Sequence, residues 1–323
     1  MLETKGGEVD PAKQQGNSCW LPTIVTRAGE KAGRRFVEFF TANIRNANTR
    51  RAYARAVGKF FTWCEDRGLE LREVEPVTVA AYVEQHPGSK PSVKQCLSAI
   101  RMLFDWLVTG QIMPFNPAAS VRGPRYAIRR GLTPVLTAGE ARRLLDSIET
   151  TTIIGLRDRA LIAVMAFSFA RIGAVLGMRM EDYFVEAGEV WFRLHEKGGK
   201  LHCVPAHPMA AVYMDAYLAA AGMGDDWKGP LFRTVGRDHV LTPRAMASND
   251  SLKMIKRRAR AAALPRTTCN HTFRATGITM YLNNGGRLER AQELAAHEDI
   301  KTTKLYDRRR EKSMMKEVRR ISI

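Results

Sequence analysis

The sequence predicts a mainly α-helical protein of two domains that also contains a small antiparallel β-sheet. Three observations support this prediction. The chain has 323 residues, and single hydrophobic cores stop growing at about 250–300 residues, which favours two domains. Apolar residues recur at helical spacing over most of the chain. Residues 190–204 differ, since they predict two strands joined by a Gly-Gly turn.

The chain is strongly basic. Lys and Arg number 51 against 33 Asp and Glu, which gives a net charge of +18. An excess of this size favours a polyanion as partner, because neutralising phosphates releases counterions and drives binding. The alternative is a basic protein with no nucleic-acid role.

No membrane span, export signal or metal site is expected from the sequence. Apolar runs of about 18 residues are missing, and the first residues lack an apolar signal core. The five cysteines are widely spread and form no CxxC pair, so neither a disulfide framework nor a zinc site is indicated. We expect a cytoplasmic, DNA-associated bacterial protein.

Residues 1–35 show weak periodicity and are predicted to be a mobile arm that could hold one short element. Residues 36–121 then predict a small helical domain. Its first strong helix carries one apolar face and ends near Gly68; that face comprises Tyr53, Val57, Phe60, Phe61 and Cys64. Arg51, Arg55 and Lys59 recur every four residues on another face. This stripe is either a solvated face or one that follows DNA phosphates.

A second strong helix is predicted from Ser92 to about Val108, with Lys94 and Arg101 away from its apolar face. A shorter segment, Val77–Glu84, lies between the two helices. Residues 122–134 follow the domain as a basic linker, because Pro and Gly break regular structure and Arg122 and its neighbours keep it solvated. The linker could cross a DNA groove or be an exposed hinge.

Residues 135–310 predict a second, mostly helical domain. Thr137 and Glu140 form a capping-box pattern, in which two side chains satisfy free amides at a helix start. Residues 157–177 are largely apolar and predict a buried helix pair that contains Arg171. Further helices are expected near residues 208–221, 243–263, 273–283 and 288–295. The tail, residues 311–323, has an amphipathic pattern that could dock on a neighbouring molecule or on its own domain.

Four polar residues gather late in the chain: His271, Arg274, His297 and Tyr306. Breaking a phosphodiester without a metal requires cations that clamp the non-bridging oxygens, an aligned nucleophile and a proton for the leaving oxygen. Tyrosine can be the nucleophile if nearby cations and a base assist its deprotonation. Taken singly, however, the histidines could be core residues and Arg171 an interior arginine paired with a carboxylate.

Together these motifs resemble the tyrosine recombinases, the phage integrase and Xer-like family. Residues 169–182, around Arg171, are similar to the family's first arginine box. Lys197-Gly-Gly-Lys200 resembles its β-turn lysine motif, and His271-Thr-Phe-Arg274 its His-x-x-Arg box. His297 stands nine residues before Tyr306, as the family's last histidine and nucleophile do. Residues 48–53 and Asn116-Pro-Ala are similar to its N-terminal core-binding domain and exit.

The resemblance implies a two-domain DNA clamp and a role for each matching residue. Arg171 and Arg274 would grip the scissile phosphate, and Tyr306 would attack it to give a 3′-phosphotyrosine and a free 5′-hydroxyl. Lys197 would protonate the leaving oxygen, although Lys200 competes for this role. His271 would assist proton transfer at the tyrosine, and His297 would hydrogen-bond the phosphate.

The resemblance also implies partners and cofactors. The substrate would be double-stranded DNA target sites, bound by a dimer per site and a tetramer on paired sites, with no metal, ATP or other cofactor. DNA contacts are expected from six basic residues: Arg51, Arg55, Lys59, Lys94, Arg101 and Arg122. The sequence does not distinguish integration, excision, dimer resolution and transposon exchange. Two rival functions also remain: relaxation of supercoiled DNA by the type IB topoisomerase mechanism, and non-catalytic DNA binding on a recombinase scaffold.

The sequence departs from the family pattern at three alanines. The family usually carries a Glu three residues after its first arginine, and this chain has Ala174 there. Asp158 and Asp182 are the candidates to replace that carboxylate. Ala275 stands where a second histidine is common, and Ala296 replaces the usual glycine before His297.

Overall fold

The computed structural model describes residues 21–126, 131–196, 198–309 and 318–321. The chain divides into two compact units between Ala127 and Ile128, a point that lies within the predicted linker. Each unit has its own hydrophobic core. In the part of the chain that is described, no helix is both long and apolar enough to cross a membrane.

The described residues of the first unit form helices and no strand. Its α-helices are α1 (Thr23–Arg27), α2 (Glu30–Glu38), α3 (Ala47–Glu65), α4 (Pro76–Gln85) and α5 (Lys90–Thr109). A π-helical turn (Phe39–Asn43) extends α2, and a 3-10 turn (Leu71–Glu73) precedes α4. The predicted apolar face of α3 is buried from Val57 to Cys64 and packs on α5, where the Phe60 and Phe104 rings meet edge to face at 6.3 Å.

Residues 21–35 differ from the prediction of a mobile arm. They form α1 and the start of α2, and Ile24 and Val25 are buried in the core of the first unit. The Ile24 amide donates to Glu65 Oε1 at 2.8 Å, and the Trp106 indole donates to the Arg35 carbonyl oxygen at 2.9 Å. A helix of one turn is too short to show periodicity in sequence, so tertiary contacts fix this segment. Residues 1–20 lie outside the described part of the chain.

The second unit contains eight α-helices among its described residues: α6 (Ala138–Asp146), α7 (Ile153–Phe167), α8 (Ile172–Leu176), α9 (Pro208–Ala221), α10 (Ser248–Ala261), α11 (Asn270–Asn283), α12 (Leu288–Leu294) and α13 (Ile300–Lys304). The predicted capping box starts α6, where the Thr137 amide donates to Glu140 Oε2 at 2.8 Å. Helix α7 is buried over most of its length and packs against α9 and α11.

Two small antiparallel sheets complete the second unit. Strands β1 (Tyr183–Glu186), β2 (Glu189–His195) and β3 (Leu201–Pro205) pair in the order β1-β2-β3. The predicted hairpin is β2–β3, in register from Trp191 opposite Pro205 to His195 opposite Leu201. Strands β4 (Arg233–Val235) and β5 (Leu241–Ala245) form the second sheet. The predicted helix over 243–263 therefore starts later, at Ser248, because residues 241–245 pair with β4.

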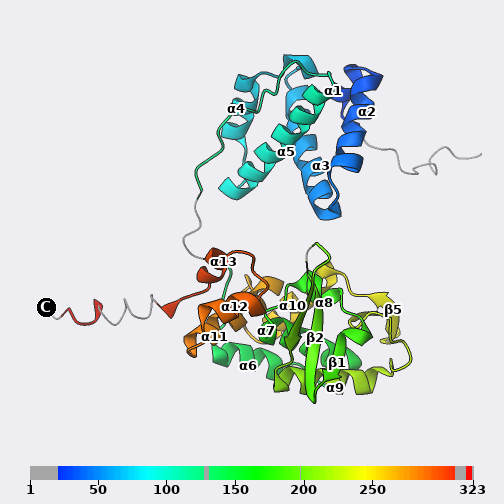
Figure 1. The fold of residues 1–323 in the computed structure, drawn as a ribbon, viewed down its shortest axis with the longest axis vertical. Helices are drawn as coiled ribbons and strands as arrows, with labels where there is room; N and C mark the ends of the chain where they lie inside the picture. The colour runs from blue at the N-terminus through cyan, green and yellow to red at the C-terminus, as the bar shows by residue number, and fades with distance from the viewer. Residues whose placement is uncertain (1–20, 127–130, 197, 310–317, 322–323) are drawn as a thin grey trace, which may run out of the picture. The chain divides into compact units, whose positions relative to one another are not determined.

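The arrangement places the late part of the chain beside the first arginine box. In Figure 1, α11, α12 and α13 lie together at one side of the second unit, and the sheets lie toward the other. The fold class, mainly α with small antiparallel sheets, is confirmed.

Candidate active site

Arg274 is at the centre of the polar cluster. Helix α11 starts just before His271, so His271 and Arg274 lie about one turn apart on it. Arg274 is 1% exposed; its Nη1 donates to the Phe169 carbonyl oxygen and its Nη2 to the Ala295 carbonyl oxygen at 2.6 Å. Its Nε is buried and has no hydrogen-bond partner among the described residues. A buried donor without a partner is costly, so such a donor calls for an acceptor from water, an ion or a ligand.

The two carbonyls that hold Arg274 belong to unusual turns. Phe169 has φ of 56° and Ala296, directly after Ala295, has φ of 47°. A non-glycine residue in the left-handed region costs about 1–2 kcal/mol and persists where surrounding structure enforces it. Arg171 follows the first turn and His297 the second. Arg274 thus links the two turns that carry these residues.

Tyr306 lies against both histidines. Its hydroxyl oxygen is 2.8 Å from His271 Nε2, and its ring stacks on that of His297 with 5.9 Å between centroids and 8° between planes. The Thr279 hydroxyl donates to the Tyr306 carbonyl oxygen at 3.1 Å. His297 Nδ1 is 2.9 Å from the hydroxyl of Thr303, which is fully buried. The structure therefore brings Tyr306, His271, His297 and Arg274 together.

The electrostatics of the cluster keep the histidines neutral. Burial raises the pKa of Tyr306, although Arg274 and Arg171 partly offset this by lowering it. Burial, and then the same two arginines, lower the pKa of His271 and bring that of His297 down to about 3. Burial also lowers the pKa of Arg274, to about 10. At pH 7 the phenol is therefore protonated, Arg274 is charged, and a neutral His271 is available to accept a proton.

Arg171 lies at the edge of a cleft of about 710 Å³ that is also lined by Glu196, Lys200, His202 and His297. Its Nη1 donates to Glu196 Oε2 at 2.7 Å. The Arg171 side chain is 41% exposed, whereas that of Glu196 is 7% exposed. Among the described residues, no group of three or more His, Cys, Asp or Glu side chains is placed to hold a metal ion.

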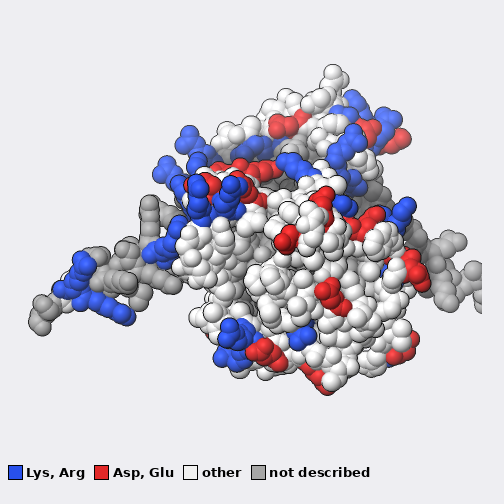
Figure 2. All heavy atoms as spheres, turned by 60° about the horizontal axis from the view of Figure 1, so that its bottom comes forward, with Lys and Arg blue, Asp and Glu red and all other residues white. Residues whose placement is uncertain are grey.

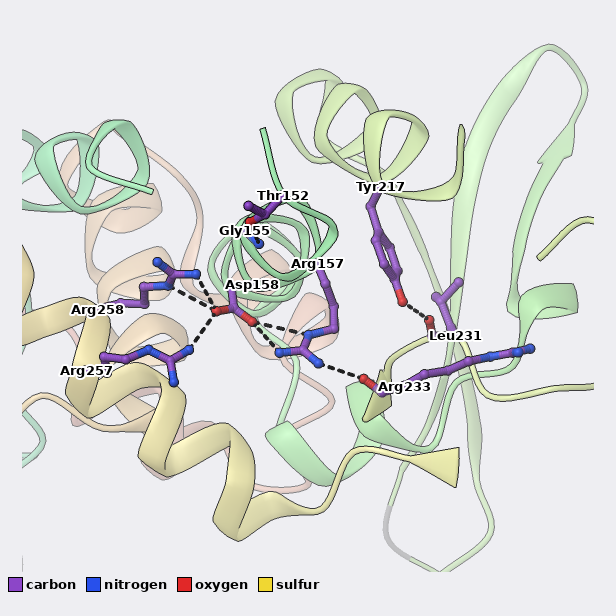
Figure 3. Close-up of polar contacts among 9 residues, drawn as sticks. All are labelled: Thr152, Gly155, Arg157, Asp158, Tyr217, Leu231, Arg233, Arg257 and Arg258. Carbon is purple, nitrogen blue, oxygen red and sulfur yellow. Dashed lines mark hydrogen bonds and ion pairs between the residues drawn. The ribbon is translucent and has the colours of Figure 1, made fainter. Parts of the chain in front are cut away.

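The prediction that Asp158 or Asp182 replaces the carboxylate missing at Ala174 is wrong. Asp158 is bound by Arg157 on its own helix and by Arg257 and Arg258 on α10, as Figure 3 shows. Asp182 accepts the Arg179 amide at 2.8 Å and lies 2.7 Å from His195 Nε2. The carboxylate on Arg171 is instead Glu196, which sequence reasoning missed. Its position directly before the Lys197 turn was the available signal.

The predicted turn lysine, Lys197, lies outside the described residues. Gly198 and Gly199 have φ of 83° and 78°, which suits glycine in a tight turn. The Glu196 amide donates to the Lys200 carbonyl oxygen at 2.8 Å and closes that turn. Lys200 Nζ is 3.4 Å from Glu298 Oε1, but both side chains are exposed, so this ion pair contributes little.

The six predicted DNA-contacting residues all belong to the first unit. Five of the six have exposed side chains: Arg51, Arg55 and Lys59 on α3, Lys94 on α5, and Arg122. Arg101 is half-buried, and its guanidinium donates to the carbonyl oxygens of Ala118 at 3.1 Å and Val121 at 2.7 Å. Arg101 therefore holds the exit of its own unit, and a DNA contact from it stays a prediction.

Known proteins resemble this chain in both sequence and fold. Residues 134–313 match the model of the Phage integrase family, and residues 35–111 match that of the Phage integrase N-terminal SAM-like domain. The chain is 27% identical over 269 residues to tyrosine recombinase XerD of Listeria monocytogenes serotype 4b (strain F2365), covering 81% of this chain and 88% of the relative.

Two solved structures show the same fold at low identity. The XerH site-specific recombinase in a post-cleavage complex with palindromic difH substrate has a TM-score of 0.73 and 18% identity, covering 93% of this chain and 97% of that one. A lambda integrase tetramer bound to a Holliday junction has a TM-score of 0.63 and 16% identity, covering 84% and 75%. Because the catalytic-domain match spans more than half of the chain, the protein belongs to the phage integrase family of tyrosine recombinases.

Proposed function

We propose that the cluster around Tyr306 performs the cleavage and rejoining by which this site-specific DNA recombinase works. One observation carries the proposal. The Tyr306 hydroxyl lies 2.8 Å from His271 Nε2, in the same cluster as the buried Arg274 guanidinium, whose Nε has no partner among the described residues. A nucleophile, a neutral base and an unsatisfied cation are thus assembled for a phosphodiester.

Arg274 and Arg171 hold the scissile phosphate. Arg274 Nε donates to one non-bridging oxygen, and Arg171 approaches from the cleft side. Two guanidinium groups stabilise the charge that grows on these oxygens in the transition state. This clamp takes the place that a metal ion holds in other phosphoryl-transfer sites.

Tyr306 then attacks the phosphorus atom. Its proton passes to His271 Nε2, in the tautomer that carries the ring proton on Nδ1. The bond from phosphorus to the 5′-oxygen breaks, and Lys197 donates a proton to that oxygen. The product is a 3′-phosphotyrosine with a free 5′-hydroxyl. Attack by another strand's 5′-hydroxyl reverses the steps, and ATP is not required because the phosphotyrosine conserves the bond energy.

His297 donates a hydrogen bond to the phosphate. Because its pKa is about 3, the ring is neutral and has one N–H. If the buried Thr303 hydroxyl donates to Nδ1, which lies 2.9 Å away, the ring proton must lie on Nε2. In that arrangement Thr303 selects the tautomer that can donate to a phosphate oxygen.

DNA is the partner of this enzyme, and we assign its contacts to the basic surfaces. These are the exposed stripe of α3, the start of α5, Arg122, and the basic helix α10. Helix α9 has no Lys or Arg, and Figure 2, which brings the α9 side of the second unit forward, shows few basic side chains over its centre. That face is poorly suited to DNA. We further propose a dimer on each site and a tetramer on paired sites, in keeping with the solved lambda integrase tetramer.

The test uses a suicide substrate, a nicked duplex that traps the covalent intermediate. The target site is first recovered by selecting bound duplexes from a random pool. Wild type should form a covalent protein–DNA adduct, Tyr306→Phe should form none, and Tyr281→Phe, on α11, should behave as wild type. Arg274→Ala should abolish cleavage while DNA affinity stays within about threefold, as for a transition-state contact. An adduct with Tyr306→Phe would refute the mechanism, and so would equal loss of binding and cleavage in an Arg274→Ala protein that keeps the wild-type melting temperature.

A further inference from the structure

Glu196 is a buried carboxylate with a single charged partner in the described structure. Its side chain is 7% exposed, and its Oε2 accepts from Arg171 Nη1 at 2.7 Å. Removing a carboxylate from water costs several kcal/mol unless a charged partner compensates. Arg171 is that partner, and a charged hydrogen bond between guanidinium and carboxylate has a defined geometry. Glu196 therefore holds Arg171 in one place more firmly than an exposed ion pair could.

The backbone around Glu196 is anchored on both sides. Strand β2 ends one residue earlier at His195, whose Nε2 lies 2.7 Å from Asp182 Oδ2, and Asp182 is itself 2% exposed. On the other side, the Glu196 amide donates to the Lys200 carbonyl oxygen at 2.8 Å. Glu196 therefore directly follows the hydrogen-bonded end of β2, and these contacts fix where its side chain starts.

Arg171 depends on this one carboxylate. Among the described residues, Glu196 is the sole hydrogen-bonding partner of its guanidinium. Ala174, one turn along α8, is buried and offers only a methyl group. With Nη1 turned toward Glu196, the remaining donors of the planar guanidinium are free for phosphate oxygens.

We propose that Glu196 is the positioning residue for Arg171 in strand cleavage, and the inference rests on the proposed function. Glu196 also directly precedes Lys197 in the chain. Glu196 thus binds the guanidinium proposed to clamp the phosphate and is the sequence neighbour of the lysine proposed to protonate the leaving oxygen. The carboxylate that Ala174 cannot supply comes from the hairpin.

The test compares Glu196→Gln with Glu189→Gln, an exposed carboxylate at the start of β2, the strand that ends just before Glu196. Single-turnover cleavage of the suicide substrate is measured at saturating protein, and DNA affinity is measured separately. We expect Glu196→Gln to slow cleavage about 10–100-fold, the range for groups that orient a functional side chain. Its DNA affinity and melting temperature should stay near wild type, and Glu189→Gln should cleave as wild type does.

A double-mutant cycle separates positioning from a general structural effect. In an Arg171→Ala background, Glu196→Gln should cause little further loss, because its partner is already gone. With an uncharged methylphosphonate in place of the scissile phosphate, the losses from Glu196→Gln and Arg171→Ala should shrink together. The methylphosphonate comparison remains valid if Glu196→Gln weakens folding, because each variant is compared with itself on the two substrates.

The outcomes distinguish this inference from the proposed function. Two results would overturn the role of Glu196 while wild type still cleaves. One is a double mutant whose loss of cleavage rate is the product of the two single losses, and the other is Glu196→Gln cleaving as fast as Glu189→Gln. A wild-type protein that forms no adduct on its selected site would overturn the proposed function, and the inference with it.

Discussion

Asp158 is expected to be the most sensitive charged residue for the stability of the second unit. It is fully buried on α7 and accepts from Arg157 Nη2 at 2.8 Å, Arg258 Nη2 at 2.8 Å and Arg257 Nη2 at 3.3 Å (Figure 3). Arg157 is only 5% exposed, so it cannot turn to water. Replacing Asp158 with Asn removes the charge on which these arginines converge.

The size of the loss follows from the burial of each partner. Removing one member of a buried ion pair costs about 3–5 kcal/mol, because the other charge is left without compensation. Arg257, with a side chain 61% exposed, adds little. Asn keeps an acceptor for one arginine, so we expect a loss of about 3 kcal/mol for Asp158→Asn, at the lower end of that range.

The assay must report on the second unit separately, since the two units can unfold independently. Hydrogen exchange of α7 peptides, followed by mass spectrometry over increasing urea, gives the free energy of unfolding of this region. The matched control is Glu293→Gln, whose ion pair with Arg290 is exposed and should contribute little to stability. A loss for Asp158→Asn no larger than that of the control would refute the reasoning.

Two further predictions concern acid stability and helix packing. The pKa of His297 is about 3 in the folded chain and near its usual value in the unfolded chain, so the unfolded state binds the proton first. The contribution of His297 to stability should therefore be full above about pH 6.5 and decrease toward pH 3, by up to about 1.4 kcal/mol per pH unit. Between pH 7.5 and pH 5, the urea midpoint should decrease less for His297→Asn than for wild type. An equal decrease in the two proteins would contradict this prediction. A Cβ at Gly277 would lie 1.9 Å from the Ala166 carbonyl oxygen, whereas one at Gly139 meets nothing within 4 Å. Gly277→Ala should cost about 3 kcal/mol in thermal unfolding and Gly139→Ala nothing, and equal melting temperatures would contradict the close packing of α11 on α7.

Local patterns predicted the parts of the fold that depend on neighbouring residues. The β2–β3 hairpin follows from its Gly-Gly turn, and the start of α6 follows from the Thr137 and Glu140 side chains. His271 and Arg274 are on one helix, so their common location follows from spacing alone. The residues from Ala295 to Tyr306 return to this helix within a short stretch of chain.

Features that depend on distant contacts were not visible in the sequence. Glu196 and Arg171 are 25 residues apart in sequence, and their contact depends on where β2 ends relative to α8. Asp158 was a reasonable candidate until the structure showed that arginines from α10, about 100 residues away, already occupy it. Helix α1 and strand β5 were missed because short elements carry too few residues to show a period.

The most direct measurement is to locate the covalent bond itself. The trapped adduct is digested with nuclease and protease, and mass spectrometry identifies the modified peptide. We expect a nucleotide attached through its 3′-phosphate to the oxygen of Tyr306. A nucleotide on another residue, or a 5′-phosphate linkage, would contradict it.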